Sequence, residues 1–145
     1  MHFVTGGSFN GKSKWVKEYY QLKDSNHLWI SFYEKEQVLV NPVLVEDPMV
    51  ILEGIEVWIK DLAAQYEVSQ AREKWRLFLS SWLEWENKDG NRKVILIGTD
   101  ISKGIVPMHA EERKWRDMTG WAYQDIARTA DRVELIWYGI SQKIK

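Results

Sequence analysis

Gly6-Gly7-Ser8-Phe9-Asn10-Gly11-Lys12-Ser13 is the stretch that decides the fold, because it satisfies the phosphate-loop pattern G-x-x-x-x-G-K-[ST]. It follows a short apolar run, residues 2–5, and opens a segment with helical spacing, residues 12–22. In this context backbone N–H groups and the helix N-terminus attract phosphate oxygens. We expect all eight residues to bind ATP or GTP, with Lys12 on the β- and γ-phosphates and Ser13 on magnesium.

Outward from this loop, apolar runs alternate with segments of helical periodicity, which is typical of a mainly parallel sheet with helices on both faces. The 145 residues fit a single domain, 1–145, of the three-layer α/β P-loop class. The expected strands are residues 2–5, 28–33, 49–52, 93–98, 132–138 and 141–144. The last two flank Gly139 and predict an antiparallel pair.

The expected helices are residues 12–22, a long region at 55–87 broken near 67–69, and 108–129. Tryptophans recur at helical spacing within 55–87, and we interpret this stripe as a buried face rather than a stacking platform for bases. Residues 34–48 contain Val38-Leu39-Val40 and Val43-Leu44-Val45 around Asn41-Pro42. Two prolines argue against a helix there, and either a hairpin or an extended crossing fits.

Charge and composition narrow the class of protein. A net charge of -1 and a pI near 6.3 count against a nucleic-acid partner. The chain has no cysteine, which excludes disulfides and thiolate metal sites. The N-terminal residues lack the features of a secretory signal, and no apolar stretch approaches the length of a membrane span. We therefore expect a cytoplasmic protein.

Two carboxylates stand at or just after the ends of expected strands. Glu53 comes after residues 49–52, and Asp100 stands shortly after residues 93–98. At the carboxyl ends of parallel strands both would face the nucleotide crevice. A magnesium nucleotide needs hard oxygen ligands, so Glu53 is a candidate metal ligand together with Ser13. Either Glu53 or Asp100 could be the catalytic base, and the sequence does not decide between them.

Motifs further along the chain give a more specific indication. Thr5-Gly6-Gly7 and Gly11-Lys12-Ser13 are followed by Gly104-Ile105-Val106-Pro107, Arg113-Lys114-Trp115-Arg116-Asp117 and a terminal run, residues 139–145. In this order they resemble the adenosylcobinamide kinase/adenosylcobinamide-phosphate guanylyltransferase family of cobalamin biosynthesis. Its motifs are T-G-G-x-x-S-G-K-S, L-L-E-C, N-E-V-G-x-G-I-V-P, R-x-F-R-D-x-x-G-x-x-N-Q and S-G-x-x-x-K-x-K.

The resemblance implies a RecA-like fold, a homotrimer, and adenosylcobinamide as the acceptor of a phosphoryl group from ATP or GTP. By position, Glu53 matches the glutamate of L-L-E-C and Asp100 the glutamate of N-E-V-G, and Arg113 and Arg116 match the arginines of the fourth motif. Those two arginines are expected either to reach phosphates or to form a solvated helix face with neighbouring acids.

The family's second activity proceeds through a guanylylated histidine between the second and third strands. Here residues 34–48 contain no histidine, and His2, His27 and His109 lie elsewhere in the sequence. A phosphoramidate intermediate needs an imidazole nucleophile, so we expect the guanylyltransferase step to be absent. Two functions stay open: a kinase that keeps only the first step, or a nucleotide-binding protein without cobinamide chemistry.

Overall fold

Six strands form one sheet in the order β2-β3-β4-β1-β5-β6 in the computed structural model, which describes residues 1–34 and 41–145. Neighbouring strands pair in parallel except β5 and β6, which are antiparallel. The strands are β1 (His2–Gly6), β2 (Leu28–Ser31), β3 (Met49–Glu53), β4 (Lys93–Thr99), β5 (Arg132–Trp137) and β6 (Ile140–Lys143). The predicted mainly parallel sheet with an antiparallel C-terminal pair is confirmed.

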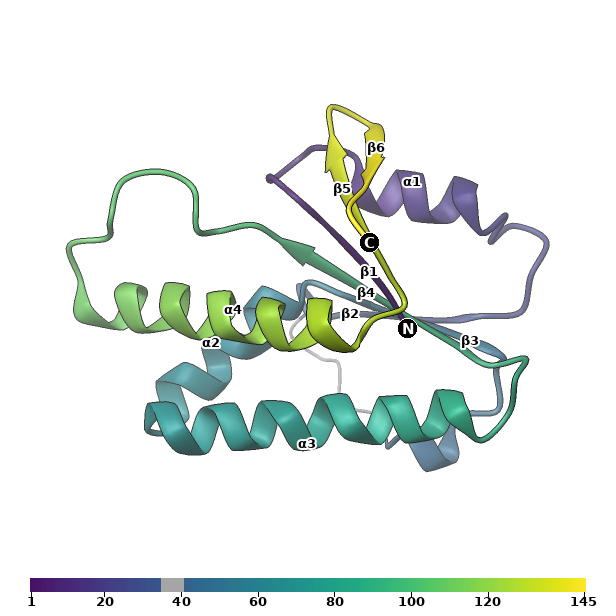
Figure 1. The fold of residues 1–145 in the computed structure, drawn as a ribbon, viewed down its shortest axis with the longest axis horizontal. Helices are drawn as coiled ribbons and strands as arrows, with labels where there is room; N and C mark the ends of the chain where they lie inside the picture. The colour runs from purple at the N-terminus through teal and green to yellow at the C-terminus, as the bar shows by residue number, and fades with distance from the viewer. Residues whose placement is uncertain (35–40) are drawn as a thin grey trace.

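Helices cover both faces of this sheet, so the molecule has three layers (Figure 1). Helix α1 lies on one face, and α2, α3 and α4 lie together on the other. Their bounds are α1 (Lys12–Tyr19), α2 (Ile55–Gln65), α3 (Val68–Asn87) and α4 (Ala110–Thr129), and a short 3-10 helix, η1, spans Pro42–Leu44. The predicted three-layer P-loop architecture is therefore confirmed.

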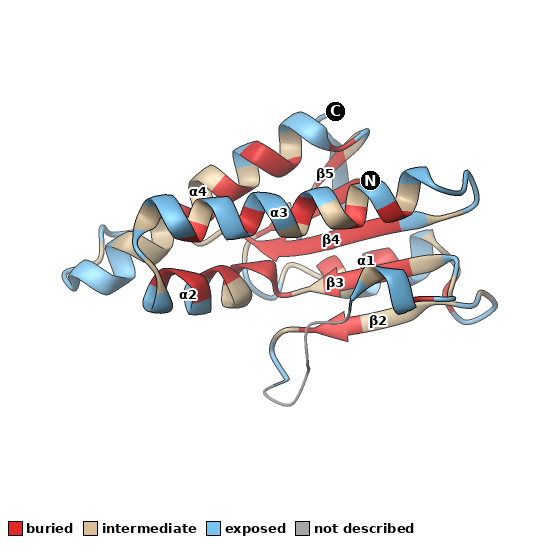
Figure 2. Ribbon diagram, turned by 90° about the horizontal axis from the view of Figure 1, so that it is seen from below, coloured by how far each residue is buried: buried red, intermediate tan, exposed pale blue. Residues whose placement is uncertain are grey.

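Strand β4 is apolar on both faces, which explains why helices cover both faces of the sheet. Its side chains alternate between two hydrophobic cores: Val94 and Leu96 face α2, α3 and α4, whereas Ile95 and Ile97 face α1. All four are essentially buried, and a strand buried on both faces reads as a continuous apolar run in the sequence. Figure 2 shows the corresponding buried stripes on the helices, which face the sheet and each other.

The tryptophan stripe of the second helical region is a buried face, as predicted. Trp75, Trp82 and Trp85 of α3 are each at most 3% exposed. Trp58 of α2 and Phe78 of α3 pack with ring centroids 4.1 Å apart, which joins the two helices. The break between these helices falls at Tyr66 and Glu67, close to the expected position.

Element ends differ from the sequence-based expectations by a few residues. Helix α1 ends at Tyr19 rather than residue 22, because Gln21 has a positive φ of 50°. Helix α4 begins at Ala110 rather than residue 108. At residues 42–44 the chain forms η1, in which the Asn41 side chain accepts a hydrogen bond from Val43 N. Residues 38–40, which were predicted to belong to a hairpin or an extended crossing, lie outside the described residues.

The strand register brings the functional segments to one edge of the sheet. Gly6 of β1 pairs with Thr99 of β4, and Glu53 of β3 pairs with Ile97 of β4. Because these strands are parallel, the phosphate loop and the ends of β3 and β4 share the carboxyl edge, where ligands bind in open α/β sheets. In the part of the chain that the structure describes, no helix has the length and hydrophobicity needed to cross a membrane.

Candidate nucleotide and acceptor site

The phosphate loop makes its turn through positive backbone angles. Gly6, Phe9 and Gly11 have φ values of 149°, 57° and 86°, and Gly11 caps α1 directly before Lys12. At Gly6 a Cβ atom would lie 2.2 Å from the carbonyl oxygen of Ile136 in β5, so only glycine fits. The glycine of the motif is thus required by the close approach of a neighbouring strand as well as by the turn.

The Lys12 side chain lies inside the loop. It is only 8% exposed, and its ammonium donates hydrogen bonds to the carbonyl oxygens of Gly6, at 3.2 Å, and Gly7, at 2.8 Å. Burial lowers the pKa of Lys12, while the nearby carboxylates of Glu56 and Glu53 oppose that shift. Within residues 1–34 and 41–145 the Lys12 ammonium bonds backbone carbonyls rather than a carboxylate, so its charge is well suited to an incoming phosphate.

The hydroxyl of Ser13, in the first turn of α1, donates a hydrogen bond to the Glu53 carboxylate at the end of β3. The other Glu53 oxygen accepts a hydrogen bond of 2.9 Å from the indole N–H of Trp29. Trp29 therefore orients the carboxylate toward the loop. A hydroxyl and a carboxylate are hard oxygen donors, and Mg²⁺ in nucleotide sites is held by one or two carboxylates together with phosphate oxygens. The donor set fits the predicted magnesium ligands.

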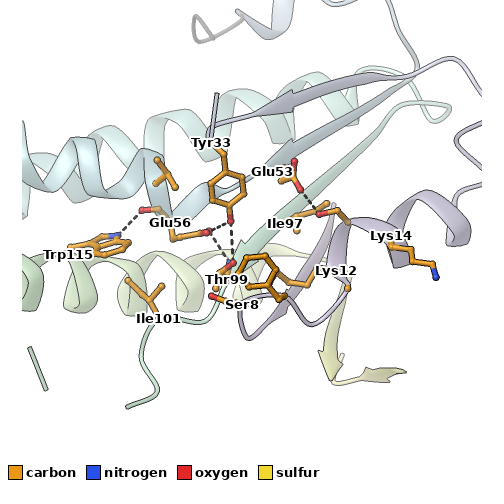
Figure 3. Close-up of a pocket in the computed structure, with 14 residues that line it drawn as sticks. Ser8, Lys12, Lys14, Tyr33, Glu53, Glu56, Ile97, Thr99, Ile101 and Trp115 are labelled. Atoms are coloured by element: carbon orange, nitrogen blue, oxygen red, sulfur yellow. Dashed lines mark hydrogen bonds between the residues drawn. The ribbon is translucent and has the colours of Figure 1, made fainter. Parts of the chain in front are cut away.

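A cavity of about 640 Å³, which we call the loop cavity, opens beside these residues (Figure 3). This size lies within the range typical of small-molecule sites. One side is the phosphate loop with Lys12 and Ser13, and the other is formed by Glu53, α2 and the end of β4. Its apolar walls are Val57, Ile97, Ile101, Tyr33 and Trp115. The loop cavity thus has a phosphate-binding side and a mixed apolar and acidic side.

Glu56 is a second carboxylate at the loop cavity, and the sequence interpretation missed it. It is 4% exposed, and it accepts hydrogen bonds from Thr99 N at 2.9 Å and from the Tyr33 and Tyr123 hydroxyls. Figure 3 shows Tyr33 and Glu56 converging on Thr99. The spacing Glu53-Gly54-Ile55-Glu56 is the signal that was available, since it places a second acid in the first turn of the next helix.

These hydrogen bonds fix the rim of the loop cavity. Burial and the hydrogen bond to Glu56 raise the pKa of Tyr33, so its hydroxyl keeps its proton as a donor. Trp115 of α4 donates to the backbone carbonyl of Glu56 at 2.7 Å. The acidic side of the cavity is therefore held by α2, α4 and β4 together.

Asp100, Arg113 and Arg116 are not among the residues that line the loop cavity. Asp100 accepts a hydrogen bond from Ser102 N at 2.9 Å and pairs with Lys103 at 3.7 Å. Arg113 donates to the carbonyl oxygens of Pro107 and Met108 in the loop before α4. Arg116 lines a separate pocket on the α4 side of β1, which Asp100 also lines. The backbone N–H of Asp100 does donate to Gly6 O at 2.9 Å. Of the two candidate bases, however, it is Glu53 whose side chain contacts the phosphate loop.

The three histidines lie outside the loop cavity. His2 is buried against α1, where its Nδ1 lies 2.6 Å from the Tyr20 hydroxyl. His27 contacts the carbonyl oxygen of Ser25, and His109 is exposed directly before α4. No imidazole is therefore placed next to the phosphate loop in the part of the chain that the structure describes.

Comparison of the sequence with known proteins shows similarity to one family. The model of the family described as cobinamide kinase / cobinamide phosphate guanyltransferase matches residues 31–144. A stretch of 53 residues is 42% identical to the bifunctional adenosylcobalamin biosynthesis protein CobU of Salmonella typhimurium and 40% identical to that of Escherichia coli. This stretch covers 37% of the chain and 29% of either relative. The family match begins after the phosphate loop, so the loop is independent evidence.

Proposed function

The chain belongs to the cobinamide kinase / cobinamide phosphate guanyltransferase family, and from this premise we propose that it transfers the γ-phosphoryl group of ATP or GTP to the hydroxyl of adenosylcobinamide. The observation that carries the proposal is the meeting of Ser13 and Glu53 beside the buried ammonium of Lys12. These are the groups that phosphoryl transfer from a magnesium nucleotide needs: a cation on the phosphates and oxygen ligands for the metal.

Each residue has a defined part in the proposed reaction. Lys12 and the loop amides bind the phosphates, and Ser13 and Glu53 would hold magnesium, which would supply neutralisation of the phosphate charge. The acceptor oxygen forms a bond to the γ-phosphorus as the bond to the bridging oxygen breaks, and the nucleoside diphosphate leaves. The hydroxyl proton passes to a carboxylate, for which Glu53 is the candidate at the loop cavity. Such catalysis depends mainly on positioning and charge stabilisation.

The hydrogen bonds of Glu56 favour a positioning role for this residue over that of a base. Both of its oxygens accept bonds from donors of the protein itself, Tyr33, Thr99 and Tyr123. A general base must be free to accept the proton of its substrate. The bond from Thr99 N to Glu56 is fixed by the backbone, whereas the Ser13 hydroxyl that bonds Glu53 would turn to magnesium and free that oxygen. We therefore assign Glu56 to holding Tyr33 and the end of β4 at the cavity wall.

We do not expect the guanylyltransferase activity that the family description includes. That step needs an imidazole nucleophile, residues 34–48 contain none, and the three histidines lie outside the loop cavity. The proposal is thus a kinase limited to the first reaction.

A second candidate is a nucleotide-binding protein without cobinamide chemistry. The observation in its favour is the place of Asp100, which pairs with Ser102 and Lys103 instead of facing the loop cavity. In addition, Asn10 stands where the family motif has serine, and the neighbouring Phe9 is fully exposed. A loop altered in this way still suits phosphate binding but offers fewer groups to an acceptor.

Mass spectrometry of adenosylcobinamide after incubation with the protein, Mg²⁺ and ATP or GTP separates these possibilities. The proposal predicts a product with one added phosphate and no added nucleotide. A GDP-linked product would show that the second step is present and that another nucleophile supplies it. Unchanged adenosylcobinamide, with nucleotide binding intact, would favour the second candidate. The matched control is Lys12→Met, which keeps the length of the side chain without its charge and should give no product.

A further inference from the structure

The turn between β5 and β6, residues 137–140, is attached to the phosphate loop at several points. Gly139 N donates a hydrogen bond of 2.8 Å to the carbonyl oxygen of Asn10, and Tyr138 N donates one of 3.0 Å to the Asn10 side chain. The Cα of Gly139 lies 3.5 Å from where a Cβ of Gly11 would stand. The turn is thus held against the same residues that form the phosphate loop.

Two aromatic side chains at this turn are exposed. Trp137 is 47% and Tyr138 79% exposed, and their ring centroids lie 5.4 Å apart in an edge arrangement. The other eight tryptophans are buried or half-buried. The Lys103 ammonium lies 4.9 Å from the centre of the Trp137 ring, which ties the loop after β4 to the same pair. Exposed aromatic rings gathered beside a ligand site are a feature of binding surfaces.

The backbone holds Tyr138 in an unfavourable conformation. Its φ is 50° and that of Gly139 is 80°, as in the tight hairpin turns whose central residues both have positive φ. Asparagine, aspartate and glycine are the usual residues at the first of these positions, and a bulky side chain there is uncommon. Strained conformations of this kind gather at functional sites. The turn itself does not favour a tyrosine at position 138. We therefore look for the reason in the binding role of its exposed ring.

We propose that Trp137 and Tyr138 form the stacking surface for the nucleobase of the nucleotide whose phosphates bind residues 6–13. The inference rests on the proposed function, since it takes the phosphate position from the loop. A nucleotide whose phosphates bind the loop amides must place its ribose and base beyond the loop. We place them toward the β5–β6 turn because this turn is bonded to Asn10 of the loop and carries the two exposed rings. Every base has a π-face, so such a surface accepts adenine and guanine alike.

Calorimetry with two classes of ligand tests the assignment. Wild type, Trp137→Ala and Tyr138→Ala are titrated with MgATP, with MgGTP and with magnesium tripolyphosphate, which carries the phosphates without a base. Stacking of one base on an aromatic side chain contributes about 1–3 kcal/mol, so each substitution should weaken the binding of both nucleotides by about 5- to 150-fold. Affinity for tripolyphosphate should stay unchanged. Trp137→Phe, which keeps a ring, should restore most of the loss.

The matched control is Ile140→Ala. Ile140 is 74% exposed and pairs directly with Trp137 across the hairpin, so its substitution removes apolar surface but no π-face. Nucleotide affinity that falls equally in Ile140→Ala, or that does not fall in the aromatic variants, overturns the inference. So does a change of oligomeric state in those variants with nucleotide affinity unchanged. If the wild type binds neither tripolyphosphate nor nucleotide, the proposed function itself fails. If the wild type binds both ligands but the aromatic variants keep full nucleotide affinity, only the stacking surface fails.

Discussion

The Ser13 hydroxyl donates a hydrogen bond to the Glu53 carboxylate, although 40 positions separate the two residues in the sequence. Ser13 stands at the start of α1, and Glu53 ends β3, which is separated from β1 by β4 in the sheet. The parallel register brings them together, because β3 and β1 both pair with β4 and end at the same edge. This contact joins the loop motif to the acidic side of the cavity.

Ser13→Ala and Glu53→Gln should therefore act on the same bound ion. Each is expected to lower the affinity gained by adding Mg²⁺ to ATP by at least about tenfold, since partners in metal sites typically contribute that much. The double variant should lose little more than the worse single variant, because the two residues form one unit. Calorimetry with ATP in Mg²⁺ and in EDTA measures both effects. Additive losses would show that the residues act separately.

Lys12→Met should weaken MgATP binding by about 10- to 100-fold, the effect of removing a charged hydrogen bond to phosphate. The substitution keeps the buried stem, so the fold should be retained. Lys23→Met removes a charge from an exposed position after α1 and is the matched control. Equal affinity of the two variants in calorimetry would contradict the assignment of residues 6–13 as a phosphate loop.

Glu56→Ala should destabilise the fold by about 1–3 kcal/mol. The substitution leaves Thr99 N without its acceptor, which is the cost of one buried donor left unpaired, whereas the Tyr123 hydroxyl keeps Thr99 O and the Tyr33 hydroxyl keeps Thr99 Oγ1 as partners. Urea unfolding monitored by circular dichroism measures the change. Glu111→Ala, at an exposed position in the first turn of α4, should change stability by no more than about 0.5 kcal/mol. Similar losses in both variants would exclude the proposed role of Glu56.

Much of the fold could be predicted because local signals agree with one another. The loop motif marks a strand-to-helix junction, and the apolar run at β4, Lys93–Thr99, has the continuous pattern of a strand buried on both faces. Element ends were less predictable. Gln21 adopts a left-handed conformation that ends α1 early, and nothing in its residue type requires this.

A site residue was predictable only where its place at the end of a parallel strand determines that it faces the crevice. Glu53 could be placed because a residue at the end of a parallel strand faces the crevice. Asp100 has the same kind of position, but its side chain turns to Ser102 N two residues on, a local contact that competes with the cavity. For Glu56 the spacing from Glu53 was a weak signal, because acids in a first helical turn are common on the surface. Only the packing of Tyr33 and α4 around it makes it a buried part of the site.

His2 should make stability depend on pH in mildly acidic solution. Burial, with the charges of Arg132, Lys93 and the N-terminus, lowers its pKa from 6.5 to about 4. As the pH falls below about 6.5 the unfolded chain therefore takes up the proton first, so this contribution to stability is complete above that pH and is lost toward about pH 4.

The change that isolates this effect is His2→Phe, which removes the titrating group and keeps a ring beside Trp15, Tyr19 and Tyr20. Between pH 7 and pH 4.5 its free energy of unfolding should fall less than that of the wild type, because other acids contribute equally to both proteins. His109→Gln, at an exposed position, should follow the wild type. Urea unfolding at several pH values measures the slopes. Parallel slopes for all three proteins would mean that the His2 imidazole is not kept neutral by burial.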